Sequence, residues 1–212
     1  MVNPRINPFN THHGRYEDWF TRHQEAYISE LLAIRALLPL HGLGLEIGMG
    51  TGRFAAPLGV EVGIDPSPEM LAYSIKKGIS CIQGMAETLP FKDAIFDYCL
   101  LVTTICFVDD PKGTLNEAHR VLKPGASIVI GFIDRTSTLG QYYLDHQAEN
   151  VFYRDATFYS APELEKLLNE TGFFDQTWGQ TLSKPLSEIQ EIEPLRDGLG
   201  DGAFVVVRAT RK

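Results

Sequence analysis

Residues 44–54 combine an apolar run with three closely spaced glycines: Gly-Leu-Glu-Ile-Gly-Met-Gly-Thr-Gly-Arg-Phe. The apolar first half is typical of a buried parallel strand, and the glycines at 48, 50 and 52 predict a sharp turn before a helix. Glycine adopts positive φ and lets backbone approach a ligand closely. The stretch therefore predicts a strand, a glycine turn and a helix N-terminus, either as a ligand site or as a plain strand-to-helix turn.

Apolar runs alternate with helical patterns along the rest of the chain. Further strands are predicted at 60–64, 79–83, 96–102, 126–133, 173–182 and 203–210. Helices are predicted at 67–77, 109–122 and 161–170. This alternation predicts an α/β fold with a doubly wound, Rossmann-like sheet of seven strands. The last two strands have no clear helix between them, so we expect a mostly parallel sheet with an antiparallel C-terminal strand, the two forming an edge pair.

The N-terminal segment, residues 1–39, is expected to be helical. Apolar side chains in residues 16–38 recur at steps of three, four and seven, which predicts one amphipathic helix that packs on the sheet or covers a site. Residues 1–15 are polar, contain two prolines and are expected to pack loosely.

Residues 134–160 are irregular and rich in aromatic side chains, with a helix expected at 139–147. A long segment of this kind between sheet elements is interpreted as a lid insertion. The polar stretch 183–202 is expected to carry some structure of its own. No boundary of a second domain is visible, so residues 1–212 are interpreted as one domain.

Composition excludes several classes of function. Among the 212 residues, 44% are hydrophobic and 22% charged, which is typical of a globular protein. The net charge of −8 disfavours a nucleic-acid partner. No apolar run approaches the ~18 residues of a membrane span, and the N-terminus lacks the apolar core of a signal peptide. The three cysteines include no CxxC pair, so we expect neither disulfides nor a metal, and a cytoplasmic location.

An acidic residue, Asp65, follows the second predicted strand, 15 positions after Gly50. Its carboxylate could accept hydrogen bonds from both hydroxyls of a ribose, or it could form an Asx turn before Pro66. A dinucleotide would favour G-x-G-x-x-G, whereas the chain has G-x-G-x-G with Glu46 two residues before it. That acid would repel a pyrophosphate, so the pattern favours a nucleoside that carries a positive charge.

These motifs resemble those of class I S-adenosylmethionine (SAM)-dependent methyltransferases, closest to the small-molecule group called methyltransferase type 11. The resemblance covers about residues 40–135. It rests on residues 46–52, Asp65, residues 84–91, residues 96–98 and residues 117–125, in that order.

The resemblance implies specific contacts with SAM. Gly48 and Gly50 would lie against its methionine part, Glu46 would hold its ammonium, and Asp65 would bind the ribose. The remaining implied contacts are Pro66 and Ser67 beside the adenine, Ala86 and Glu87 at the adenine edge, and Thr103 at the methionine end. Met85 stands where many relatives have an acid, which leaves adenine recognition to backbone, to Glu87 or to apolar stacking.

The implied reaction is an in-line transfer of the methyl group to a small-molecule acceptor. No catalytic residue is assigned, since candidate bases also fit packing or surface roles. These candidates are His12, His13, Tyr16, His119, Tyr142, Tyr143 and His146. An NAD-dependent oxidoreductase and a non-catalytic, cofactor-binding regulatory module remain as alternatives. The acceptor and the oligomeric state stay open.

Overall fold

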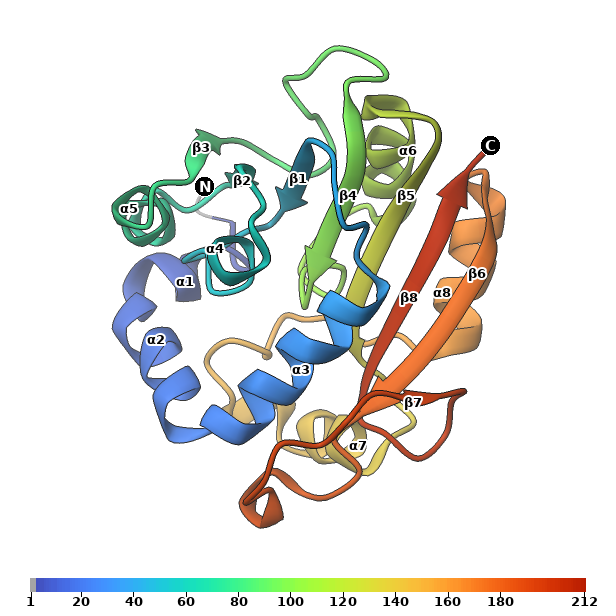
Figure 1. Cartoon of the computed structure of the whole chain (residues 1–212). Coiled ribbons are helices and arrows are strands. Elements are labelled where there is room, and N and C mark those ends of the chain that lie inside the picture. The colour runs from blue at the N-terminus through green and yellow to red at the C-terminus, as the bar shows by residue number, and fades with distance from the viewer. Residues whose placement is uncertain (1–2) are drawn as a thin grey trace.

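A computed structural model describes residues 3–212 and contains one mixed sheet of eight strands (Figure 1). Its order is β3-β2-β1-β4-β5-β8-β6-β7. The strands are β1 (Gly44–Ile47), β2 (Val62–Asp65), β3 (Ser80–Gln83), β4 (Phe96–Val102), β5 (Leu122–Ile133), β6 (Phe173–Thr181), β7 (Arg196–Asp197) and β8 (Phe204–Arg211). The eighth strand beyond the expected seven is β7, a two-residue strand within the polar stretch 183–202.

Helices connect the strands and also precede them. They are α1 (Asn7–Thr11), α2 (His13–Arg22), α3 (Gln24–Leu37), α4 (Ala55–Leu58), α5 (Pro68–Lys76), α6 (Pro111–Val121), α7 (Thr138–Asp145) and α8 (Ala161–Glu170), with short 3-10 turns at Gln147–Glu149 and Leu186–Glu188. The α5 helix begins as predicted, because the Ser67 hydroxyl caps it by accepting from the backbone N–H of Met70.

The first five strands form the parallel half of the sheet. β1 pairs in parallel with β2 and with β4, β2 with β3, and β4 with β5. Strand order reverses at β1 and β4, and the carboxyl ends of these strands face the N-terminal helices. In an open α/β sheet this is where ligands bind.

The C-terminal strands confirm the expected antiparallel pair at one end of the sheet, with only the two-residue β7 outside it. Within this pair the last strand, β8, is the inner one, because it also pairs antiparallel with β5. Only the short β7 pairs with the far side of β6. Four consecutive buried residues, Phe204–Val207, explain the position, because a strand apolar on both faces is stabilised most by burial between two neighbours.

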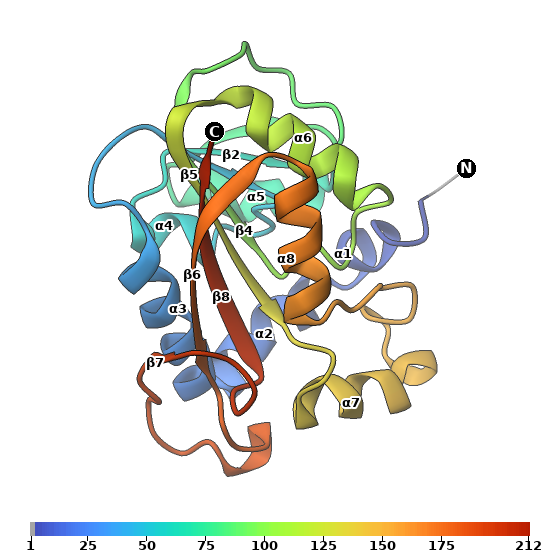
Figure 2. The same cartoon turned by 90° about the vertical axis from the view of Figure 1, so that its right-hand side faces the viewer.

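Helices cover both faces of the sheet, with α3 on one face and α6 and α8 on the other (Figures 1 and 2). Side chains of one strand alternate between the two cores, as the pleat requires. In β4, Leu100 packs in the core beneath α3 and α4, whereas Cys99 and Leu101 pack in the core beneath α6 and α8.

The N-terminal segment departs from expectation in two ways. The single helix predicted over residues 16–38 is interrupted at His23 (φ −124°, ψ 51°), which separates α2 from α3. Residues 3–15 are not loose, since they form α1 and the start of α2; residues 1 and 2 lie outside the described part. The Arg5 guanidinium donates hydrogen bonds to the Val108 carbonyl and to Thr157 Oγ1 (3.1 Å), which connects this segment to the body of the protein.

None of the helices within residues 3–212 has both the length and the apolarity that a membrane span requires.

Candidate functional site

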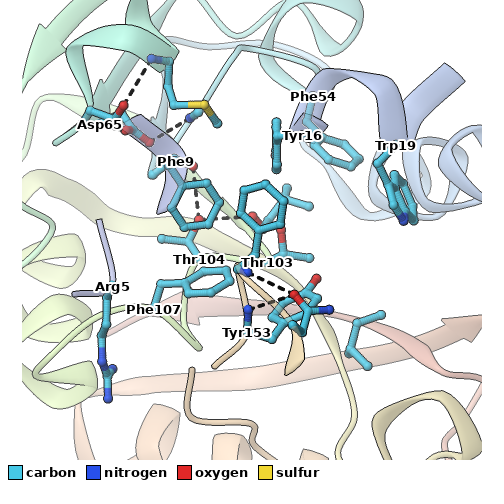
Figure 3. A pocket seen from close by; sticks show the side chains of 18 of the residues that line it. Arg5, Phe9, Tyr16, Trp19, Phe54, Asp65, Thr103, Thr104, Phe107 and Tyr153 are labelled. Carbon is cyan, nitrogen blue, oxygen red and sulfur yellow. Dashed lines mark hydrogen bonds between the residues drawn. The ribbon is translucent and has the colours of Figure 1, made fainter. Parts of the chain in front are cut away.

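A cavity of about 780 Å³ lies at the carboxyl ends of β1, β2 and β4, under the N-terminal helices (Figure 3). Eight of the nine residues predicted to bind the cofactor line it: Gly48, Gly50, Asp65, Pro66, Ser67, Ala86, Glu87 and Thr103. The topology thus brings together residues that are up to 55 positions apart in the sequence. Among residues 3–212, no group of His, Cys, Asp and Glu is placed to hold a metal ion.

The glycine turn has the predicted backbone geometry, and its glycines serve different purposes. Gly48 (φ +71°) packs against Thr104, whose side chain would overlap with a Cβ at this position. At Gly50 (φ +53°) a Cβ would instead lie 3.6 Å from the Tyr16 hydroxyl and 3.2 Å from Met70 Cε. Gly48 is therefore explained by packing within the protein, whereas Gly50 keeps space between two residues of the cavity wall.

Asp65 joins the glycine turn to the start of α5. One carboxylate oxygen accepts a hydrogen bond from Gly50 N–H (2.8 Å), and the other accepts from Ser67 N–H (2.9 Å), which is an Asx turn. Burial raises the pKa of Asp65 to about 6, although these two hydrogen bonds act in the opposite direction. A carboxylate has about four acceptor positions, so it still has positions for a ligand after both bonds are made.

The loop after β3 lines the cavity beside Asp65. Glu87 Oε1 accepts from the backbone N–H of Asp109 (2.9 Å), just before α6, and Met85 and Ala86 also line the wall. One oxygen of Glu87 is thus engaged within the protein. The neighbouring Met85 offers an apolar surface for a planar group.

Two threonines follow β4 in the middle of the cavity. Thr103 has φ +49°, an uncommon conformation for this residue, and its N–H donates to the Gly131 carbonyl (2.7 Å). Thr104 Oγ1 donates to the carbonyl oxygens of Gly48 (3.2 Å) and Val102 (3.1 Å). These bonds fix the end of β4 against the glycine turn.

Glu46 is the one predicted residue that is absent from the cavity wall. Its side chain is 1% exposed and accepts a hydrogen bond from the backbone of Ala55, behind the glycine turn. Burial raises the pKa of Glu46 well above its ordinary value, and within residues 3–212 its Oε2 has no hydrogen-bond partner. Burial and, after it, the nearby Glu46 raise the pKa of Tyr16, which does line the cavity.

Aromatic side chains from distant segments form the other half of the cavity, and sequence reasoning did not bring them together. Phe9 of α1 packs against Phe107 at 5.0 Å between ring centroids and against Phe152 at 5.3 Å. Phe107 stacks on Tyr153 at 5.6 Å. Figure 3 shows Phe9, Phe107 and Tyr153 near Thr103 and Thr104, with Tyr16 and Trp19 beyond them.

The candidate bases separate into two groups. Tyr16, Tyr142 and Tyr143 line the cavity. The four candidate histidines do not line it. His13 hydrogen-bonds Tyr73 (3.0 Å), and His119 packs edge-on against Phe173.

Sequence reasoning also missed Glu30, an acid of α3 that is 4% exposed and lines the cavity. A signal was available, because Glu30 follows Tyr27 by three positions and precedes Ile34 by four. That spacing puts it on the apolar face of the helix.

Comparison with known proteins identifies the family of the chain. The model of a methyltransferase-domain family matches residues 45–130. The chain is similar to a Thermotoga maritima protein of known crystal structure, with 48% sequence identity and a TM-score of 0.96. That protein is named a SAM-dependent methyltransferase and possible histamine N-methyltransferase. The alignment covers 98% of this chain and 100% of that chain. The chain belongs to the class I SAM-dependent methyltransferases.

The chain also has sequence relatives in other organisms. An uncharacterized protein of Methanocaldococcus jannaschii is 41% identical over 97% of this chain and 100% of its own length. A demethylmenaquinone methyltransferase of Chlorobaculum tepidum is 38% identical over an aligned region that covers 47% of this chain and 45% of that enzyme. SAM is therefore the cofactor of this methyltransferase, as the sequence motifs implied, and not NAD.

Proposed function

We propose that this methyltransferase transfers the methyl group of SAM to a small-molecule acceptor that occupies the aromatic half of the cavity, by in-line displacement. The observation that carries the proposal is the division of one cavity into two halves. One half has the glycine turn and Asp65, and the other has the rings of Phe9, Phe107 and Tyr153. A volume of about 780 Å³ is within the range of small-molecule sites.

The cofactor assignments rest on this arrangement. Asp65 would accept the ribose hydroxyls at its free acceptor positions, and Gly48 and Gly50 would lie along the methionine part. Pro66, Ser67, Ala86 and Glu87 would surround the adenine, with Met85 against its face. Thr103, at the junction of the two halves, would lie near the methionine end.

Glu46 would act on the ammonium of SAM from behind the glycine turn. Its buried Oε2 has no partner among residues 3–212, and a buried carboxyl in that state is stabilised by a nearby positive charge. Because the side chain does not line the cavity, we expect a water molecule or the turn backbone between the two groups.

SAM supplies an activated methyl group, so the chain's main tasks are to orient the acceptor and to exclude water. The N-terminal helices and residues 134–160 perform the second task, since both contribute aromatic residues to the same wall. The acceptor nucleophile would approach from this wall.

A thermal shift measurement tests the cofactor site. S-adenosylhomocysteine (SAH) at 100 times its Kd should stabilise the native state by about 2.7 kcal/mol, which corresponds to a rise in Tm of roughly 5–10 °C. Asp65→Ala should reduce this rise. Asp97→Ala should leave it unchanged, because Asp97 also binds a backbone N–H, that of Leu43, but lies outside the cavity. Equal shifts in both variants would contradict the ribose assignment, and a shift with NADH alone would contradict the proposal.

A further inference from the structure

Glu30 is a buried acid that the protein itself does not neutralise. Helix α3 buries two polar side chains, Ser29 and Glu30. Ser29 is satisfied, since its hydroxyl donates to the Glu25 carbonyl (2.7 Å) and accepts from Glu193 N–H (2.8 Å). For the Glu30 carboxyl, residues 3–212 provide no hydrogen bond and no ion pair.

Burial without a partner is costly for a carboxyl group. Burial raises the pKa of Glu30 to about 8, and no other group contributes to that shift. The carboxyl therefore keeps its proton at neutral pH in the ligand-free protein. A partner from outside the chain would remove this cost.

The surroundings of Glu30 indicate what that partner is. Tyr16 of α2, Tyr143 of α7 and Tyr153 line the same cavity as Glu30, and the pKa of each is raised chiefly by burial and to a smaller extent by Glu30. Other charged or titratable groups of the cavity wall include Arg15, Arg22, His23 and Tyr142. Tyr27 of α3 also has a pKa raised chiefly by burial and to a smaller extent by Glu30.

The Tyr143 and Tyr153 rings lie 4.8 Å apart between centroids, so the cavity that Glu30 lines also has adjacent aromatic rings in its wall. An acid within aromatic walls is the combination that attracts an ammonium group. The carboxylate neutralises its charge, and the ring faces attract it through their quadrupoles. Neutral acceptors such as alcohols would gain neither interaction.

We propose that Glu30 binds the amino group of the methyl acceptor and takes the proton that this nitrogen must lose, so that the acceptor is a small amine. This inference rests on the proposed function, because it places the acceptor in the aromatic half of the cavity.

The proton balance follows from the charges. Binding of an ammonium expels the Glu30 proton to solvent and forms an ammonium–carboxylate pair. The ammonium proton then passes to the carboxylate, which frees the nitrogen lone pair. The lone pair forms the C–N bond as the C–S bond breaks, and the electron pair of that bond goes to sulfur. The product leaves as a methylammonium, and Glu30 is again protonated.

Calorimetry on the full chain loaded with SAH tests this proposal. The probes are primary amines of increasing size, from methylamine to 2-phenylethylamine and histamine, each paired with the alcohol of the same shape. At pH 7, in two buffers of different ionisation enthalpy, we expect amines to bind with release of about one proton. Glu30→Gln should weaken the best amine by about 30-fold or more and abolish the proton release.

The controls separate this proposal from the cofactor site. Glu30→Gln replaces a protonated carboxyl by an amide of nearly the same shape, so SAH should bind to it as to the wild type. Glu25→Gln, on the same helix and outside the cavity wall, should behave as wild type toward amines. If no amine distinguishes wild type from Glu30→Gln, or if alcohols bind as well as amines, the proposal is wrong. If the wild-type protein does not bind SAH at all, the proposed cofactor site is wrong instead.

Discussion

Asp65 and Glu30 are both buried acids of the same cavity, yet their chemistry differs. Asp65 accepts two backbone hydrogen bonds, and its pKa is raised only to about 6. Glu30 has no such bonds, and its pKa is raised to about 8. Hydrogen bonds to the charged form offset part of the desolvation cost. The two acids are therefore suited to different partners: hydroxyl donors at Asp65 and a cation at Glu30.

The pH dependence of stability should reveal the state of Glu30. Its pKa in the folded protein exceeds the ordinary value of 4.5, so the native state binds more protons than the unfolded state between pH 4.5 and about 8. The free energy of unfolding must fall as pH rises through this window. The Glu30→Gln variant lacks this titrating group, so its free energy of unfolding does not fall in this way. Relative to wild type, its free energy of unfolding should rise by about a few kcal/mol between pH 5 and pH 8.

Urea unfolding of the ligand-free proteins at the two pH values measures this difference. The buried acids Glu46 and Asp65 are present in both proteins and cancel in the comparison. Parallel pH profiles for wild type and Glu30→Gln would show that Glu30 is ionised in the folded protein, contrary to its raised pKa.

At the scale of elements, the N-terminal helices complete the cavity and do not merely flank the sheet. α1 contributes Phe9, α2 contributes Tyr16, and α3 contributes Glu30 to one wall. The break at His23 makes this possible, because a single straight helix over residues 16–38 could not fold back over the sheet and the cavity together. Arg5, half-buried, holds the start of this segment against the β4–α6 connection and the end of residues 134–160.

Removal of the Arg5 side chain should loosen α1 without unfolding the protein. Arg5→Ala removes hydrogen bonds to Val108 and Thr157, each of which contributes about 1 kcal/mol. We expect amide exchange in α1, for example at His12 N–H, to accelerate by about tenfold or more. Exchange in β4 should be unchanged. Arg154→Ala, an exposed control, should not affect α1, and equal acceleration in both variants would contradict the role of Arg5.

At the scale of the whole molecule, the strand nearest the C-terminus holds the two halves of the sheet together. β8 pairs with β5 on one side and with β6 on the other over most of its length. Because each neighbour reaches the other only through β8, the sheet is continuous only when this strand is in place.

Core substitutions should reflect that position. Phe204 of β8 is fully buried, and Phe204→Ala should lower the free energy of unfolding by about 3–5 kcal/mol through lost contacts and a cavity. Phe174 of the neighbouring β6 is only partly buried beside Lys212, and Phe174→Ala should cost about 1 kcal/mol or less. Urea denaturation of both variants checks this, and similar costs would contradict a central role for β8.

Much of the fold follows from local patterns in the sequence. The strand at 96–102 and the helix at 161–170 have the predicted bounds, and Ser67 caps its helix as expected. In all three cases the determinants are neighbours in the chain: apolar runs, turn residues and capping side chains. The sequence also predicted the SAM cofactor, because the glycine turn and Asp65 follow consecutive parallel strands whose carboxyl ends lie at the same edge of the sheet.

Tertiary structure alone decided the rest. Hydrophobic periodicity predicts which face of a helix or strand is buried, but not which other element it packs against. That pairing of elements decides the interior place of β8, the break at His23 and the burial of Arg5. The same holds for the cavity. Glu30 has the spacing of a core residue in its helix, but only the tertiary structure places it in the wall of a cavity that Tyr16, Tyr143 and Tyr153 also line. The sequence thus determined the family, the cofactor and the motifs of the glycine turn and Asp65, whereas the aromatic part of the cavity was set by long-range contacts among segments that no local pattern connects.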